Sequence, residues 1–191
     1  MVTDAQLSEL VALVARWALA AKYRIVTAES CTGGWIAKAF TDAAGSSRWF
    51  ECGYVTYSNA AKVRDLGVSS RTLDEHGAVS EPTVREMAAG ALRVSGADVS
   101  IAVSGIAGPD GGTAEKPVGS VWFCVGRRGA RSHVTGFGEA PVDAGGGGPG
   151  GPNAADGAGF ELIAEGEVFG GDRETVRRAS VKRALEMVLR L

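Results

Sequence analysis

The stretch IVTAESCTGGWI, residues 25–36, passes from an apolar run through paired glycines into a second apolar segment. We expect Ile25-Val26 to form a short buried strand and residues 35–40 to begin a helix. Ser30 then lies at a strand-to-helix turn, where unpaired helix N–H groups could assist a nucleophile. The stretch therefore predicts either a helix N-cap or a nucleophile at Ser30. Cys31 is the rival nucleophile, although a buried cysteine usually behaves as a small hydrophobic residue.

The composition fits one globular domain with a full hydrophobic core. The chain has 191 residues, of which 45% are hydrophobic and 22% charged, and a typical domain has roughly 100–200 residues. The net charge of −2 gives no basic surface for nucleic acid or for an anionic membrane. The basic pairs Arg177-Arg178 and Lys182-Arg183 are expected on the solvated face of a helix.

Membrane, metal and export signals are weak in this chain. No apolar run reaches the ~20 residues of a membrane span, and residues 7–21 read as an amphipathic core helix. Three cysteines without a C-x-x-C pair argue against a structural zinc site and favour a cytoplasmic location. We therefore expect no metal and no other cofactor.

Apolar spacing and turn residues predict helices that alternate with short strands. Helices are expected at residues 7–21, 35–42, 59–66, 80–92 and 172–188. Strands are expected at residues 25–26, 54–57 and 99–104, and as a hairpin of residues 118–125 with 132–137. Thr3 and Gln6 have the spacing of a capping box, and Ser80 and Asp172 are expected to begin helices. This alternation predicts a single-domain three-layer α/β/α sandwich with a mixed sheet over residues 1–191.

A glycine-rich segment interrupts this order at residues 139–166. It contains GGGGPGGP at residues 145–152 and few large apolar side chains. Such a segment cannot bury enough apolar surface to offset the entropy lost on ordering. We expect a flexible surface insertion within the domain, and a substrate lid is the alternative.

A second polar cluster, residues 57–62 (YSNAAK), again joins a strand end to a helix. Lysine can act as a general base when burial lowers its pKa, and serine–lysine pairs can replace serine–histidine pairs. If the two strands are neighbours, their carboxyl ends bring Tyr57 and Lys62 towards Ser30. Glu29 is a rival base, although it should point to the opposite face of its strand. The ordinary alternative is an exposed helix lysine beside a partly buried tyrosine.

The third cluster, residues 104–113 (SGIAGPDGGT), follows the strand expected at residues 99–104. Glycines let backbone N–H groups approach an anion closely. Ligands of open α/β sheets bind at the carboxyl ends of strands, where all three clusters would lie. The run matches neither G-x-x-x-x-G-K-[ST] nor G-x-G-x-x-G, so neither motif identifies a nucleotide here. An anion-binding loop and a purely structural loop both remain open.

These clusters closely resemble the CinA C-terminal domain family, together with residues 76–80 (HGAVS), 115–119 (EKPVG) and 171–173 (GDR). The resemblance covers nearly the whole chain in order; the long glycine-rich segment is its main departure. It implies hydrolysis of the carboxamide of nicotinamide mononucleotide to nicotinate mononucleotide and ammonia. The expected partner is thus a small-molecule pyridine nucleotide, with neither nucleic acid nor membrane, and a homo-oligomer is compatible with the sequence.

By this resemblance, Ser30 is the nucleophile and Tyr57 and Lys62 are its activating partners. The resemblance places substrate contacts at Thr32, Gly33, Asn59, Gly105, Ala107 and Gly108. In the implied acyl-enzyme mechanism, N–H groups around Thr32 and Gly33 hold the oxyanion. The loop at residues 105–108 holds the phosphate, with a cationic side chain that the sequence does not identify. A non-catalytic nucleotide-binding or competence-linked interaction module and an amidase for another small amide are the alternatives.

Overall fold

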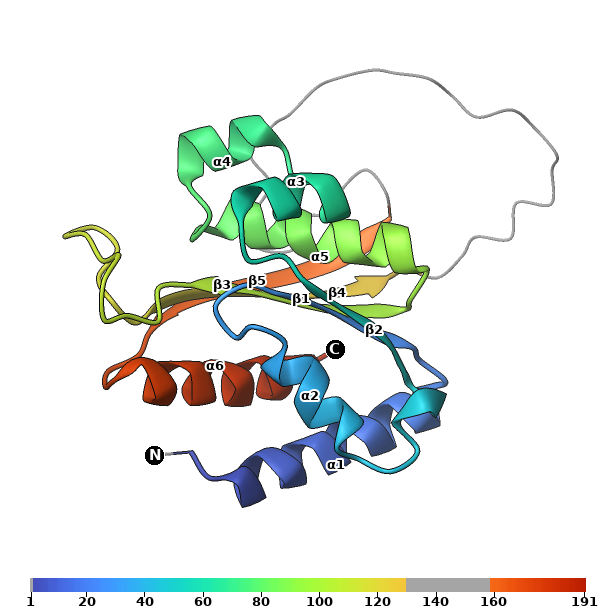
Figure 1. The fold of residues 1–191 in the computed structure, drawn as a ribbon. Coiled ribbons are helices and arrows are strands. Elements are labelled where there is room, and N and C mark those ends of the chain that lie inside the picture. The colour runs from blue at the N-terminus through green and yellow to red at the C-terminus, as the bar shows by residue number, and fades with distance from the viewer. Residues whose placement is uncertain (1, 130–158) are drawn as a thin grey trace, which may run out of the picture.

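A mixed five-stranded sheet lies between two layers of helices (Figure 1). The computed structural model describes residues 2–129 and 159–191. The strands are β1 (Ile25–Glu29), β2 (Phe50–Val55), β3 (Val99–Gly105), β4 (Ser120–Arg128) and β5 (Phe160–Val168). They are arranged in the order β2-β1-β3-β4-β5, with β1 parallel to β2 and β3, and β4 antiparallel to β3 and β5. The predicted three-layer α/β fold with a mixed sheet is confirmed.

Each face of the sheet has its own hydrophobic core. The helices are α1 (Asp4–Ala21), α2 (Trp35–Thr41), α3 (Asn59–Leu66), α4 (Ser70–His76), α5 (Glu81–Ser95) and α6 (Arg173–Val188), with a short 3-10 helix η1 (Ser46–Arg48). Helices α1, α2 and α6 cover one face, and α3, α4 and α5 cover the other (Figure 1). Along β3, Ile101 and Val103 enter the first core, whereas Ala102 enters the second. None of the described helices is long and apolar enough to cross a membrane.

Side-chain caps fix where several helices begin, as the sequence predicts. The Gln6 N–H donates to Thr3 Oγ1 at 3.2 Å, and the Thr3 N–H donates to Gln6 Oε1 at 2.9 Å. This pair is a complete capping box before α1. Ser80 and Asp172 cap α5 and α6 through one side-chain bond each, accepting from the backbone N–H three residues later.

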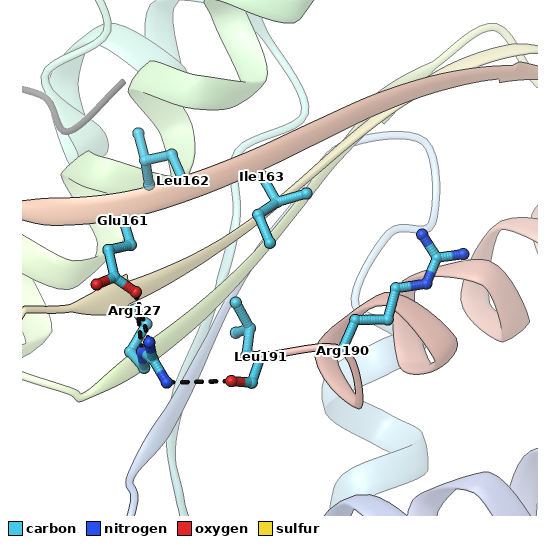
Figure 2. A pocket seen from close by; sticks show the side chains of 6 residues that line it. All are labelled: Arg127, Glu161, Leu162, Ile163, Arg190 and Leu191. Carbon is cyan, nitrogen blue, oxygen red and sulfur yellow. Dashed lines mark hydrogen bonds and ion pairs between the residues drawn. The ribbon is translucent and has the colours of Figure 1, made fainter. Parts of the chain in front are cut away.

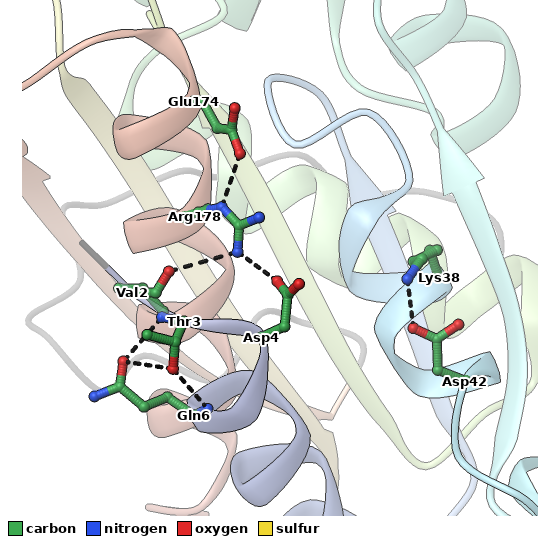
Figure 3. A network of polar contacts seen from close by, with 8 residues as sticks. All are labelled: Val2, Thr3, Asp4, Gln6, Lys38, Asp42, Glu174 and Arg178. Carbon is green, nitrogen blue, oxygen red and sulfur yellow. Dashed lines mark hydrogen bonds and ion pairs between the residues drawn. The ribbon is translucent and has the colours of Figure 1, made fainter.

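Arg178 ties the first helix to the last (Figure 3). Its guanidinium lies 2.5 Å from Asp4 at the start of α1 and 2.9 Å from Glu174 on its own helix. It also packs over the ring of Trp35, at 5.1 Å from the ring centroid. The expectation of a solvated helix face is therefore wrong for Arg178, because α1 and α2 pack against this side of α6.

The fifth strand differs from the sequence prediction. The partner of β4 is β5, whereas the predicted hairpin partner, residues 132–137, lies outside the described residues. Strand β5 also begins within the segment expected to be a flexible insertion, so that expectation is wrong for residues 160–166. Phe160 and Leu162 alternate with exposed residues and enter the core beneath α5. The part of that segment at residues 139–158 lies outside the described residues.

A hollow of about 350 Å³, here called the C-terminal hollow, lies beside the end of the chain (Figure 2). It is lined by Arg127, Glu161, Leu162, Ile163, Arg190 and Leu191. Arg127 pairs with Glu161 at 2.5 Å and donates to the Leu191 carbonyl oxygen at 3.0 Å. Because Arg127 is in register with Val99, the first residue of β3, this hollow lies at the amino ends of the parallel strands.

Candidate active site

A smaller cavity of about 210 Å³, here called the carboxyl-edge cavity, opens at the carboxyl ends of the parallel strands. It is lined by Ser30, Cys31, Tyr57, Lys62, Ala78, Val79, Ser104, Gly105, Ala107 and Arg173. Residues from all three sequence clusters thus lie around one space. The convergence follows from topology, because β1 lies between β2 and β3 and all three run in the same direction.

Lys62 reaches the serine turn from the first turns of α3. Its Nζ lies 3.1 Å from Ser30 Oγ, 2.9 Å from the Thr56 carbonyl oxygen and 3.4 Å from the Tyr57 carbonyl oxygen. The Ser58 side chain caps the helix by accepting from the Ala61 N–H at 3.1 Å, which fixes where α3 begins. The Lys62 side chain is almost completely enclosed, with 1% of the residue exposed.

Burial lowers the pKa of Lys62 from its ordinary value, because an enclosed ammonium loses its hydration. A neutral amine has two N–H donors and one lone pair. The carbonyl oxygens of Thr56 and Tyr57 can accept the two N–H bonds, and the Ser30 hydroxyl can donate to the lone pair. The site therefore has the hydrogen-bonding partners that a neutral lysine acting as a general base requires.

The turn after β1 places Ser30 without using it as a helix cap. The Ser30 N–H donates to the Val103 carbonyl oxygen at 3.0 Å, which continues the pairing of β1 with β3. Helix α2 begins five residues later, and its N-cap is Gly34, which has φ +89 and no side-chain cap. Only a glycine adopts this left-handed conformation easily. The N-cap interpretation of Ser30 is therefore wrong, and its hydroxyl faces Lys62 instead.

Glu29 occupies the helix terminus that was expected to face the nucleophile. Its two carboxylate oxygens accept from the N–H groups of Ile36 at 3.0 Å and Ala37 at 2.8 Å. A carboxylate at a helix N-terminus is favourable both for these hydrogen bonds and for the helix dipole. The N–H groups of α2 are thus committed to Glu29, which lies on the opposite face of β1 from Ser30 and is not a base for it.

Arg177, on α6, holds the backbone on the other side of the serine turn. It donates to the carbonyl oxygens of Cys31 at 3.1 Å and Thr32 at 2.8 Å. Its guanidinium also packs over the Trp35 ring at 5.1 Å from the centroid. The sequence prediction of a solvated helix face is wrong here too. Nothing local in the sequence links Arg177 to a turn about 145 residues earlier.

Tyr57 contributes to the cavity differently from the prediction. Strand β2 ends at Val55, short of the predicted residues 54–57, so Tyr57 lies in the loop beyond it. Its side chain is 62% exposed, and its hydroxyl accepts from Arg173 at 3.3 Å. The contact with Lys62 is made by the Tyr57 carbonyl oxygen. The ring therefore forms part of the cavity wall and does not touch the lysine amine.

Arg173, the first residue of α6, is a cationic residue of the cavity that the sequence prediction did not include. It lines the cavity and donates to the Gly108 carbonyl oxygen at 2.8 Å. The only sequence signal for it is its place in the Gly171-Asp172-Arg173 run. Its two contacts join α6 to the loop after β3 and to Tyr57.

The other predicted substrate residues divide into two groups. Gly105 and Ala107 line the cavity, and Gly108 supplies the carbonyl oxygen that accepts from Arg173. Thr32, Gly33 and Asn59 do not line it. The Gly33 N–H donates to the Ser30 carbonyl oxygen at 3.0 Å, and Asn59 is exposed at the start of α3. The structure thus leaves Gly33 without a free N–H for an oxyanion.

Packing explains one of the glycines in the loop after β3. A Cβ atom added at Gly105 would lie 2.7 Å from Val121 Cγ2 and 2.9 Å from the Ser120 carbonyl oxygen. The neighbouring Ile106 N–H donates to the same Ser120 oxygen at 2.8 Å. Glycine is required at this position for close approach to β4, independently of any anion.

Cys31 is the weaker candidate for a nucleophile. Burial raises the pKa of its thiol to about 12. The thiolate is the reactive form of cysteine, so a buried thiol that stays protonated at neutral pH is inert. Among the two adjacent candidates, only Ser30 has a base within hydrogen-bonding distance.

Together, the fold and the cavity define a three-layer α/β protein with a buried serine–lysine pair at the carboxyl edge of its sheet. The model of the CinA C-terminal domain family matches residues 7–139. The chain belongs to this family, which confirms the resemblance seen in the sequence.

Named relatives and solved structures resemble nearly the full chain. Nicotinamide-nucleotide amidohydrolase PncC of Escherichia coli is 46% identical over 184 residues, covering 96% of this chain and 93% of the relative. The protein of the same name from Pseudomonas putida is 45% identical, covering 88% of this chain and 86% of the relative. The crystal structure of a competence/damage-inducible protein from Agrobacterium tumefaciens is 38% identical and superposes with a TM-score of 0.77, covering 97% and 94% of the two chains.

Proposed function

We propose that this protein hydrolyses the carboxamide of nicotinamide mononucleotide to nicotinate mononucleotide and ammonia, in the cytoplasm. The observation that carries the proposal is the 3.1 Å contact between Lys62 Nζ and Ser30 Oγ in a cavity at the carboxyl edge of the sheet. The names of the relatives from Escherichia coli and Pseudomonas putida support the substrate.

In the proposed mechanism, Ser30 Oγ attacks the carboxamide carbon while its proton moves to the neutral Lys62 amine. The tetrahedral intermediate collapses as Lys62 returns that proton to the amide nitrogen, and ammonia leaves. Water then attacks the acyl-enzyme, with Lys62 again accepting a proton, and nicotinate mononucleotide is released as Ser30 regains its hydrogen. Each proton that Lys62 takes up is given back, so the amine ends the cycle neutral.

The developing oxyanion needs donors other than the Gly33 N–H, because that group is bound to the Ser30 carbonyl oxygen. We assign this role to the backbone N–H group of Cys31, which lines the cavity in the turn held by Arg177. A rigid turn suits the role, since donors that are already oriented need no reorganisation in the transition state. This modifies the sequence prediction, because neither Thr32 nor Gly33 lines the cavity.

Arg173 is the proposed contact for the substrate phosphate. It is the one arginine or lysine besides Lys62 among the described residues that line the cavity. Guanidinium groups suit phosphate because their N–H donors match its oxygens. The loop at residues 105–108 supports Arg173 through the Gly108 carbonyl oxygen.

Ammonia release from nicotinamide mononucleotide by the purified protein tests this proposal. We expect the Ser30→Ala variant to lose at least about 1,000-fold in kcat, the scale for removal of an activated nucleophile. Ser8→Ala, an exposed serine on α1, is the matched control and should retain wild-type activity. A folded Ser30→Ala protein with undiminished ammonia release would overturn the serine mechanism.

The same assay separates this proposal from its alternatives. A non-catalytic nucleotide-binding or interaction module would bind the mononucleotide without releasing ammonia from it. An amidase for another small amide would release ammonia only from that amide, and its activity would still depend on Ser30.

A further inference from the structure

One buried hydroxyl in the carboxyl-edge cavity has no hydrogen-bond partner in the described part of the chain. Among the described residues, six enclosed side-chain atoms lack a partner, namely Thr27 Oγ1, Thr32 Oγ1, Thr56 Oγ1, Ser100 Oγ, Ser104 Oγ and Arg183 Nε. Only Ser104 also lines this cavity. An enclosed polar group without a partner is costly, and a ligand that supplies the partner removes that cost.

The sheet places Ser104 directly beside the proposed nucleophile. Strands β1 and β3 are parallel and pair Glu29 with Val103, so the next residues along each strand, Ser30 and Ser104, are neighbours. Side chains alternate between the two faces of a sheet. Val103 enters the core under α1, α2 and α6, so Ser104 points to the opposite face, where α3 brings in Lys62.

We propose that the Ser104 hydroxyl binds the leaving amide nitrogen of the substrate, a role that rests on the function proposed above. Lys62 must lie near that nitrogen to protonate it, and Ser104 points to the same face of the sheet as Lys62. The proposed oxyanion donor, the Cys31 N–H group, lies instead in the turn after Ser30, whose carbonyl oxygens accept from Arg177. Ser104 therefore contacts the nitrogen and not the carbonyl oxygen of the scissile amide.

The chemistry of the leaving group requires an acceptor at this point. A carboxamide nitrogen carries two N–H bonds, and the protonated Lys62 ammonium can only donate hydrogen bonds. The Ser104 oxygen can accept from one of these N–H bonds, which turns the nitrogen lone pair of the tetrahedral intermediate towards Lys62. The proton then passes from Lys62 Nζ to nitrogen as the carbon–nitrogen bond breaks, while Ser104 keeps its own proton throughout.

Ser100 offers a matched control on the same strand. It lies four residues before Ser104, on the same face of β3, and its hydroxyl is also enclosed and without a partner. It does not line the cavity. Alanine at either position removes a hydroxyl that makes no hydrogen bond within residues 2–129 and 159–191, so neither variant should have a lowered Tm.

The test compares two substrates, nicotinamide mononucleotide and the methyl ester of nicotinate mononucleotide, whose leaving group carries no N–H bond. We expect Ser104→Ala to lower kcat for the amide by about tenfold to a hundredfold, the scale of one lost hydrogen bond in a transition state. KM for the amide should stay within about twofold, as should kcat for the ester. Ser104→Cys, with a weaker acceptor of similar shape, should fall between wild type and alanine, and Ser100→Ala should match wild type with both substrates.

The outcomes separate this role from the proposed function. An equal loss with both substrates, a loss confined to KM, or no loss with the amide would overturn the role of Ser104 while leaving the amidase activity intact. A wild-type protein that releases no ammonia would overturn the proposed function and this role with it. A lowered Tm in Ser104→Ala and in Ser104→Cys, with activity lost equally on both substrates, would assign Ser104 a structural role.

Discussion

The two hollows at opposite ends of the sheet differ in how their polar groups are satisfied. The C-terminal hollow is the larger, at about 350 Å³ against about 210 Å³ for the carboxyl-edge cavity. In the larger one, Arg127 is paired with Glu161 (Figure 2). Arg190, which also lines it, lies 2.6 Å from Glu165. Among the residues that the structure describes, the smaller one encloses a lysine without a carboxylate partner and a serine hydroxyl without any partner.

Buried polar groups that lack their usual hydrogen-bond or ionic partners therefore indicate a candidate site better than the volume of a cavity does. Ion pairs around the C-terminal hollow hold the last residues of the chain in place, and they leave few unpaired polar groups there for a ligand to bind. At the carboxyl edge, the buried amine and the free hydroxyl cost stability, and a protein retains such groups where they serve function. Two substitutions and a pH profile test this difference between the hollows.

The largest effect is expected from Lys62→Met, which removes the amine and keeps a side chain of similar length. We expect kcat to fall at least about 1,000-fold, because Ser30 loses the base that activates it. Arg127→Met, at the C-terminal hollow, is the matched control; it should leave kcat and KM within about twofold. Ammonia release and circular dichroism on both variants measure activity and folding. Comparable losses in the two would mean that the two hollows do not differ in function.

An intermediate effect is expected from Arg173→Met. Loss of a charge-assisted hydrogen bond to phosphate should raise KM for the mononucleotide by about tenfold to a hundredfold. Nicotinamide riboside lacks the phosphate, so its KM should stay unchanged in the variant. The control is Lys116→Met, since the Lys116 amine donates to the His76 carbonyl oxygen and does not line the cavity. Equal shifts of KM for both substrates would remove the case for a phosphate contact.

The smallest effect concerns pH. Only neutral Lys62 can accept the Ser30 proton, so kcat/KM should rise by about tenfold per pH unit below the pKa of Lys62 and level off above it. Because burial lowers this pKa, the plateau should begin below the ordinary lysine range. A pH profile of kcat/KM measures this. A rate that falls with increasing pH would contradict a neutral lysine base, and a rise that continues through the ordinary lysine range would contradict the lowered pKa of Lys62.

The sequence predicts the parts of the site that depend on local pattern. Strand ends followed by polar residues and helix starts identify Ser30 and Lys62, and parallel strands bring them to the same edge. Helix starts at Thr3, Ser80 and Asp172 are equally local, since each depends on a side chain that reaches only three residues ahead. These predictions concern neighbours in sequence or in an adjacent strand.

Contacts between distant segments account for what the sequence misses. Arg173 and Arg177 reach loops that are 65 to 146 residues away along the chain, and nothing in the residues around them indicates these partners. Strand β5 is missed for a different reason. Its alternation of buried and exposed residues is short and directly follows a glycine-rich segment, and the composition of that segment outweighs the alternation when neighbouring residues are considered together. The sequence also misses that the Ser104 hydroxyl lacks a partner, because only the structure shows which buried polar groups make no hydrogen bond among the described residues.

The position of Arg177 on the last helix also affects when the site can form during synthesis of the chain. Ser30 and Lys62 leave the ribosome early, whereas the side chain that holds the Cys31 and Thr32 carbonyl oxygens belongs to the last helix. Contacts between such distant residues form late, because a long loop must close first. A nascent chain can therefore contain Ser30 and Lys62 before Arg177 is present to orient the turn after Ser30. We expect full catalytic activity only once α6 has packed against the rest of the protein.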